Sequence, residues 1–122
     1  MIKSALTVFL GILFSADFLF SSPVNNLQII QLFTKNGCAP DQIKFESVSL
    51  VTPSDRIYYC RSECGANACT YSVYIKSGAA YIYSGQFSGR YQILPGASPK
   101  KIKVEHPLTE PKELTYRDKQ YQ

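Results

Sequence analysis

The sequence is poor in the residues on which enzymes most often depend. It has one histidine, His106, among 122 residues, and it contains no P-loop, no G-x-G-x-x-G and no G-x-S-x-G motif. Catalysis needs a base positioned beside a nucleophile, whereas His106 precedes Pro107 at the start of a charged C-terminal stretch. The carboxylates are scattered, without the pair that glycoside hydrolysis needs. We therefore expect a protein that is not an enzyme and needs no cofactor.

The composition excludes several further classes. Glycine and proline number only seven each, which excludes collagen and low-complexity linkers, and tryptophan is absent. Apolar residues make up 45% of the chain, too many for a disordered protein, and the length allows one domain at most. The net charge of +4 is a mild excess that does not by itself indicate a class of partner.

The first 21 residues differ in character from the rest. Lys3 precedes an apolar run of 16 residues (5–20), which is typical of the core of a signal peptide. The run is shorter than the roughly 20 residues of a membrane-spanning helix, and it contains Asp17, whose carboxylate is costly in a bilayer. We predict a signal peptide over 1–21, cleaved after Ser21, with an uncleaved anchor or a buried helix as alternatives. The protein is then periplasmic or secreted, and not an integral membrane protein after cleavage.

Four cysteines follow the predicted cleavage site, and an even number in a short exported chain indicates two disulfides. If the segment from Cys60 to Cys69 is a hairpin loop, these two cysteines face each other and Cys64 reaches back to Cys38. We prefer that pairing, and Cys38–Cys60 with Cys64–Cys69 is the second choice. A zinc site of three cysteines and His106 is the metal alternative, but the C-x2-C pairs typical of structural zinc are missing, so no metal is expected.

Downstream of the apolar run the hydrophobic spacing changes from helical to alternating. Residues 25–36 place apolar side chains at helical spacing, with an asparagine at the start and Gly37 at the end, although an extended lead-in strand is the alternative. From residue 42 onward apolar and polar residues alternate, with a change of phase that indicates a bulge near Ser47. The expected strands cover residues 43–50, 56–61, 68–76, 80–83, 86–94 and 101–105.

Short strands joined by tight turns indicate an antiparallel β-meander. With one short helix before it, the fold class is α+β or mainly β, built as a single sheet or a small barrel and stapled by two disulfides. A single sheet would have one face on the helix and one wet, tyrosine-rich face. We expect this β-rich domain to span 22–105. Residues 106–122 are charged and include two prolines, which predicts a partly ordered tail.

A tyrosine-rich surface is the expected contact area of a binding protein. Tyrosine offers a large amphipathic surface at low entropy cost, and Tyr81, Tyr83 and Tyr91 lie on the predicted strands. Nearby basic residues could extend this surface toward an anionic polymer, but a solvated edge strand explains them more simply: Arg90, Lys100, Lys101 and Lys103. We expect an unidentified protein or cell-envelope polymer as partner, and no nucleic acid.

One short motif carries a resemblance. The segment Ser77-Gly78-Ala79-Ala80-Tyr81 is similar to the S-G-x-x-Y signature of bacterial periplasmic lysozyme inhibitors of the membrane-bound and C-type class. The resemblance implies a small exported β-barrel in which Ser77 and Tyr81 lie on an inhibitory loop that enters the lysozyme cleft. The match covers five of 122 residues, and the three clustered cysteines and basic charge depart from the pattern. Inhibition of a cell-wall hydrolase is therefore the alternative function.

Overall fold

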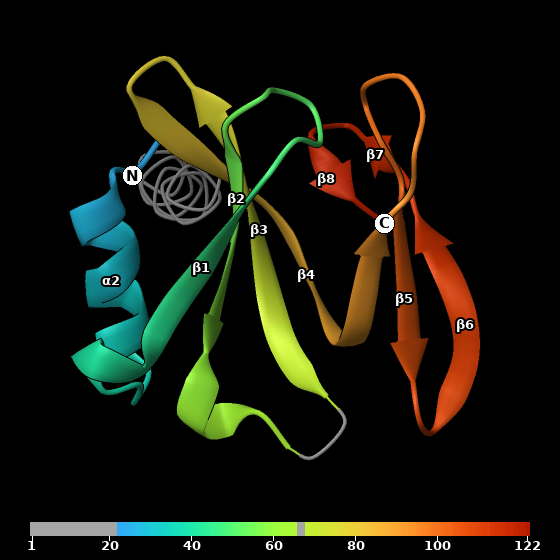
Figure 1. The fold of residues 1–122 in the computed structure, drawn as a ribbon. Coiled ribbons are helices and arrows are strands. Elements are labelled where there is room, and N and C mark those ends of the chain that lie inside the picture. The colour runs from blue at the N-terminus through green and yellow to red at the C-terminus, as the bar shows by residue number, and fades with distance from the viewer. Residues whose placement is uncertain (1–21, 66–67) are drawn as a thin grey trace, which may run out of the picture.

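The computed structural model describes residues 22–65 and 68–122, so the predicted signal peptide over 1–21 lies outside the described residues. One α-helix precedes an antiparallel sheet of six strands in the order β1-β2-β3-β4-β5-β6, which confirms the predicted fold class (Figure 1). β1 and β6 are the two edges, so the sheet is not a closed barrel. The elements are α2 (Asn26–Lys35), β1 (Ile43–Val48), β2 (Asp55–Cys60), β3 (Cys69–Ser77), β4 (Ala80–Ile93), β5 (Ile102–His106), β6 (Thr109–Leu114), β7 (Tyr116–Arg117) and β8 (Gln120–Tyr121), with short 3-10 helices at Pro40–Gln42 and Arg61–Glu63.

The helix forms where the spacing predicted it, because its first turn is capped. The Asn25 side chain accepts a hydrogen bond from the Gln28 backbone N–H at 2.8 Å, and the Gln28 side chain accepts one from the Asn25 N–H. The helix ends before Gly37, whose φ of 98° is strained for residues with a Cβ. Ile29 is the helix residue that is buried against the sheet.

β4 is one long bent strand and not the two short strands expected over 80–83 and 86–94. Its first part pairs with β3, up to Gly89 opposite Cys69, and residues 90–93 pair with β5. A Cβ on Gly89 would collide with the carbonyl oxygen of Glu105, so this glycine lets β5 approach closely. Residues 76–81 form the hairpin turn between β3 and β4, whereas 87–91 lie within β4.

Both faces of the sheet carry buried side chains, so the expectation of one solvent-exposed, tyrosine-rich face is wrong. On one face Ile57 and Val73 belong to the main core, and on the other their neighbours Tyr58 and Tyr74 pack under α2. This alternation follows from the two-residue period of strands. The main core consists of Leu50, Ile57, Val73, Ile75, Phe87, Ile102, Val104, Leu114 and Tyr121. The second cluster is Ile29, Tyr58, Tyr74 and Tyr81.

The predicted tail over 106–122 belongs to the fold. His106 ends β5, residues 109–114 form β6 along it, and residues 116–121 form the small β7–β8 hairpin. The Tyr121 hydroxyl donates to the Lys100 carbonyl at 2.7 Å. Residues 109–114 are mostly polar because β6 is an edge strand on which only Leu114 is buried. The alternation of apolar and polar residues that marks a strand is therefore missing from this segment.

A buried carboxylate organises the turn between β1 and β2. Asp55 is fully buried and accepts backbone hydrogen bonds from Leu50, Val51 and Thr52 at 2.8–3.1 Å. Lys76 on β3 donates a further backbone hydrogen bond at 3.0 Å. This turn joins the strands expected over 43–50 and 56–61, but the bulge predicted near Ser47 is absent, since β1 and β2 pair in unbroken register.

The cysteines form Cys38–Cys60 and Cys64–Cys69, so the preferred pairing is wrong and the second choice is the one observed. Cys60 is the last residue of β2 and lies opposite Ile43, the first residue of β1. Cys38, which lies between α2 and β1 in the sequence, can therefore bond to Cys60. Cys64 and Cys69 then close the short loop before β3. In the part of the chain that is described, no helix is long and apolar enough to cross a membrane.

Candidate binding groove

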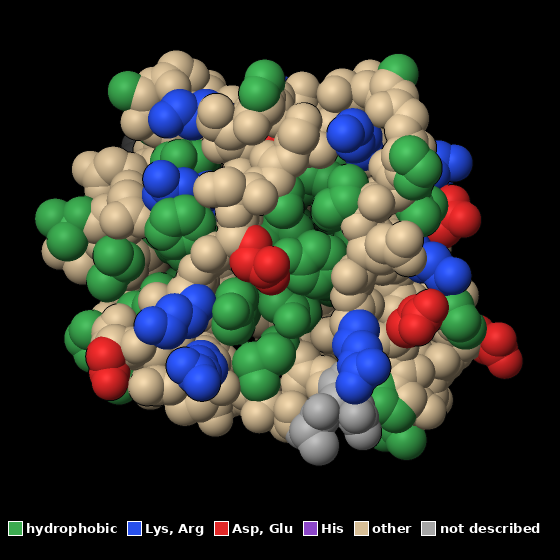
Figure 2. Space-filling model, viewed as in Figure 1, with side chains coloured by type: hydrophobic (Ala, Val, Ile, Leu, Met, Phe, Trp, Pro, Cys, Tyr) green, Lys and Arg blue, Asp and Glu red, His purple; other side chains and the backbone are tan. Residues whose placement is uncertain are grey.

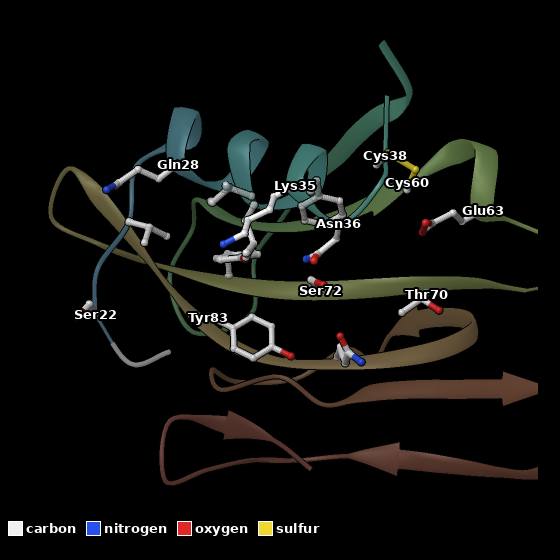
Figure 3. Close-up of a pocket in the computed structure, with 16 residues that line it drawn as sticks. Ser22, Gln28, Lys35, Asn36, Cys38, Cys60, Glu63, Thr70, Ser72 and Tyr83 are labelled. Carbon is white, nitrogen blue, oxygen red and sulfur yellow. A yellow bond between two sulfur atoms is a disulfide. The ribbon is translucent and has the colours of Figure 1, made fainter. Parts of the chain in front are cut away.

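A groove of about 490 Å³ lies between α2 and the strands β3 and β4 (Figure 3). Its lining combines apolar and polar residues, as in small-molecule sites. The apolar residues, called the floor here, are Val24, Ile29, Leu32, Phe33, Tyr74, Tyr83 and the Cys38–Cys60 disulfide. The polar residues, called the mouth here, are Ser22, Gln28, Lys35, Asn36, Glu63, Thr70, Ser72 and Gln86.

Two tyrosines form the aromatic part of the floor. The rings of Tyr74 and Tyr83 pack edge to face, with centroids 5.6 Å apart. Burial, with smaller contributions from Tyr83 and Tyr58, raises the pKa of Tyr74 to about 12. Burial also raises the pKa of Tyr83 above its ordinary value. Both phenols are therefore neutral at physiological pH and offer hydroxyl groups without charge.

The mouth of the groove includes a positively charged side chain, that of Lys35. Figure 3 shows Lys35 and Asn36 reaching from the end of α2 toward β3 and β4, with Ser72 and Tyr83 on the opposite wall. Lys35 is exposed and is the basic residue of the last helical turn, so its ammonium group faces solvent and groove together. Glu63, the acidic residue of the lining, lies at the other end of the groove near Cys60 and Thr70 (Figure 3). The groove can therefore accept an apolar body on its floor and an anionic group beside Lys35.

The residues predicted to form one tyrosine surface do not lie together. Tyr81 is only 5% exposed: its ring packs under the Arg56 guanidinium, 4.9 Å away, and its backbone pairs with Val24. Tyr83 lines the groove. Tyr91 packs on the main core, on the other face of the sheet. Ser77 is exposed at the β3–β4 turn.

A local irregularity in β4 separates these tyrosines. The register with β3 shifts between Ser72 and Tyr74, so that Ser72 pairs with Gln86 whereas Tyr74 pairs with Tyr83. One extra residue in β4 reverses which face the following side chains occupy. Tyr81 and Tyr83 therefore face the helix, and Tyr91 faces the core. A single exposed surface of these three tyrosines is excluded by this geometry.

Tyr91 lies instead beside a carboxylate. Its hydroxyl donates to Glu46 Oε1 on β1 at 2.7 Å, and its ring packs on Tyr71 with centroids 4.9 Å apart. Burial and this carboxylate raise the pKa of Tyr91 well above its usual range. Figure 2 shows hydrophobic side chains gathered at the centre of the visible face around an acidic side chain, with lysine and arginine side chains further out.

One residue of the basic run, Lys103, lies on an interior strand rather than on an edge, and Lys100 and Lys101 precede that strand. Lys103 belongs to β5, which is flanked by β4 and β6. Lys101 lies 3.9 Å from Glu113, and Lys103 lies 3.5 Å from Glu105. Val104 pairs with Tyr91 and Lys103 pairs with Gln92, so Lys103 and Tyr91 point to opposite faces of the sheet, and Tyr91 does not form one surface with this lysine.

The described residues, 22–65 and 68–122, form no metal constellation. All four cysteines are in disulfides, and no three His, Cys, Asp or Glu side chains in these ranges converge on a metal position. No family model matches the chain, and searches of curated proteins and of solved structures gave no match either. The groove is therefore the feature from which a function can be argued.

Sequence reasoning missed the groove, although it predicted the helix and both strands beside it. Local patterns in the sequence do not mark it. In the structure Leu27 and Leu32 are 61% and 48% exposed, so the helix carries more apolar surface than the sheet buries, and large exposed apolar patches mark interaction sites.

Proposed function

We propose that this protein is a small exported, non-enzymatic binding protein whose binding site is the groove between α2 and the β3–β4 strands. The observation that carries the proposal is a volume of about 490 Å³ over buried aromatic side chains. Ligand sites of small molecules have volumes of roughly 300–1,000 Å³ and combine an apolar lining with a few polar groups. The two disulfides are compatible with an exported protein.

The chemistry of the groove favours a ligand with an apolar body and an anionic group. The floor offers Ile29 and two neutral tyrosines, and Lys35 is the cation that Figure 3 shows at the mouth. A ligand of this kind is an acyl chain, an aromatic acid or the apolar carboxyl-terminal end of a peptide. The unidentified partner expected from the sequence would present one of these groups.

The proposal is tested with the dye 1-anilinonaphthalene-8-sulfonate, which combines an aromatic body with an anionic group. The purified disulfide-bonded protein is titrated with the dye and its fluorescence is followed. Ser72→Trp fills the groove between α2 and β3, so we expect saturable binding that this variant abolishes. Lys35→Gln should weaken binding by about three- to tenfold. Lys112→Gln, on exposed β6, is the matched control and should have no effect.

Equal dye binding by the wild-type protein and Ser72→Trp would show that the groove is not the site. Thermal unfolding of each variant, followed by circular dichroism, is measured in parallel. It separates a blocked groove from a misfolded protein, which would bind the dye more strongly.

A second proposal is inhibition of a cell-wall hydrolase through the Ser77–Tyr81 loop. It is favoured by the tight turn at Ser77 and Gly78, which exposes Ser77. Tyr81 is only 5% exposed, so its ring can take part only if the Arg56 guanidinium and the Lys76 ammonium, 4.9 and 4.8 Å from its centroid, move away. A lysozyme assay with micromolar protein tests this directly, and unchanged lysozyme activity would contradict it.

A further inference from the structure

One edge of the sheet is open. β1 pairs with β2 on one side. Apart from the Ile43 N–H at its start, which donates to the Pro40 carbonyl, no backbone hydrogen bond in the described part of the chain joins β1 to a further segment. Residues 44–47 are all exposed. Such an edge presents unpaired N–H and carbonyl groups to a further strand, and proteins commonly protect it with proline, bulges or charged side chains. β1 has no proline and no bulge, and its two charged residues, Lys44 and Glu46, have opposite signs.

The opposite edge differs in this respect. β6 carries Pro111, which has no backbone N–H to donate, and its register with β5 shifts between Val104 and His106. The β6 edge thus has a proline and an irregular register, whereas the β1 edge has neither. Of these two edges, β1 is the one suited to accept another strand.

The side chains of β1 have opposite charges on either side of an aromatic ring. Phe45 is 43% exposed on the face that carries Tyr58, with ring centroids 5.2 Å apart, and the Arg56 guanidinium lies 4.1 Å from its centroid. Lys44 and Glu46 alternate with it and therefore point to the other face, where Tyr91 donates to Glu46.

This order is self-complementary in one antiparallel register. We infer that β1 pairs with β1 of a second copy of this chain, with Phe45 opposite Phe45 of the other copy. Lys44 of each copy then lies opposite Glu46 of the other, twice across the two-fold axis, and the two phenylalanine rings meet on the opposite face. A two-fold symmetric contact of this kind is the commonest form of homo-oligomer.

Charge distinguishes this register from its neighbours. Directly opposed residues of antiparallel strands must point to the same face, so the register can shift only in steps that keep this parity. A shift in one direction places Lys44 opposite Lys44, and a shift in the other places Glu46 opposite Glu46. Both oppose like charges directly, which destabilises strand pairing. The dimer does not depend on a ligand in the groove, because β1 does not line it.

Sedimentation velocity of the purified disulfide-bonded protein, from micromolar to about 0.5 mM, tests the dimer. We expect a concentration-dependent dimer for the wild-type protein. Glu46→Lys and Lys44→Glu should each raise the dissociation constant by about tenfold or more, because every Lys–Glu contact becomes a like-charge contact. The double variant K44E/E46K restores both opposite-charge contacts and should dimerise again. Lys112→Glu on the β6 edge is the matched control and should leave dimerisation unchanged.

Cysteine cross-linking tests the register independently. In the inferred register position 45 faces itself across the axis, whereas Ser47 faces Ile43 of the other copy. We therefore expect Phe45→Cys to form a covalent dimer under mild oxidation and Ser47→Cys to stay monomeric on a non-reducing gel. A wild-type protein that is monomeric at 0.5 mM would overturn the inference. So would a folded K44E/E46K variant that fails to dimerise where the wild-type protein does, or cross-linking of Ser47→Cys in preference to Phe45→Cys.

Discussion

Replacing Asp55 by asparagine tests whether a buried carboxylate holds the β1–β2 turn to the sheet. One oxygen, Oδ2, accepts the three backbone N–H groups of residues 50–52, and Oδ1 accepts the Thr52 hydroxyl at 2.5 Å and the Lys76 N–H at 3.0 Å. The asparagine side chain has nearly the same shape but only one acceptor oxygen. If that oxygen takes the position of Oδ2, the amide NH2 group faces the Lys76 N–H, and two donors oppose each other.

The magnitude follows from these contacts. Leaving one buried N–H without an acceptor costs about 1–3 kcal/mol. The hydrogen bonds that survive lose the charge of their acceptor, and charge-assisted bonds are roughly twice as strong as neutral ones. Together we expect Asp55→Asn to lower the free energy of unfolding by about 2–4 kcal/mol. For a domain of about 100 residues this corresponds to a midpoint lower by about 10–30 °C.

Urea unfolding without reductant, followed by circular dichroism, measures this loss. Asp41→Asn is the matched control: Asp41 is exposed, its side chain accepts only a long contact of 3.4 Å from Gln42, and its replacement should change stability by less than about 0.5 kcal/mol. Equal stability of the two variants would refute the view that the Asp55 carboxylate stabilises the turn.

Two further predictions concern the disulfides and the tyrosines. Peptide mapping by mass spectrometry should find the disulfides Cys38–Cys60 and Cys64–Cys69. Replacing Cys38 and Cys60 by alanine should lower the free energy of unfolding by about 3 kcal/mol, and replacing Cys64 and Cys69 by about 2 kcal/mol, because the first disulfide joins residues 22 positions apart and the second residues 5 apart. The raised pKa of Tyr74, about 12 in the folded protein, stabilises the fold fully below pH 10, and this contribution is lost as the pH rises from 10 to 12, because the unfolded chain ionises first. The free energy of unfolding of Tyr74→Phe should therefore fall less steeply than that of the wild-type protein over this range, and parallel curves would contradict the assignment.

The helix and most strands could be predicted because their signals are local. Asn25 and Gln28 form a capping box within one turn, and the alternation in residues 68–76 is that of the observed β3. β6 could not be predicted in the same way. An edge strand with one buried side chain, Leu114, has no alternation of apolar and polar residues to detect. Only its pairing with β5 makes this segment a strand of the sheet.

The candidate groove could not be predicted from local patterns, because the residues that line it come from distant parts of the sequence. Lys35 at the end of α2 and Ser72 on β3 are far apart in sequence, and nothing near either residue indicates that they border one cavity. The tyrosines show the same limit. Their identity and spacing were visible, but one extra residue in β4 placed Tyr83 in the groove and Tyr91 on the opposite face.

The sequence by itself determined the order of one helix and an antiparallel meander, and an even set of cysteines able to join in pairs. These features depend on residues a few positions apart, so composition and periodicity are sufficient to specify them. The tertiary structure alone decided that Cys60 bonds to Cys38, that residues 109–121 complete the fold, and which tyrosines share a face. Those outcomes depend on strand register and on the bend of β4, where a shift of one residue exchanges the two faces of the sheet.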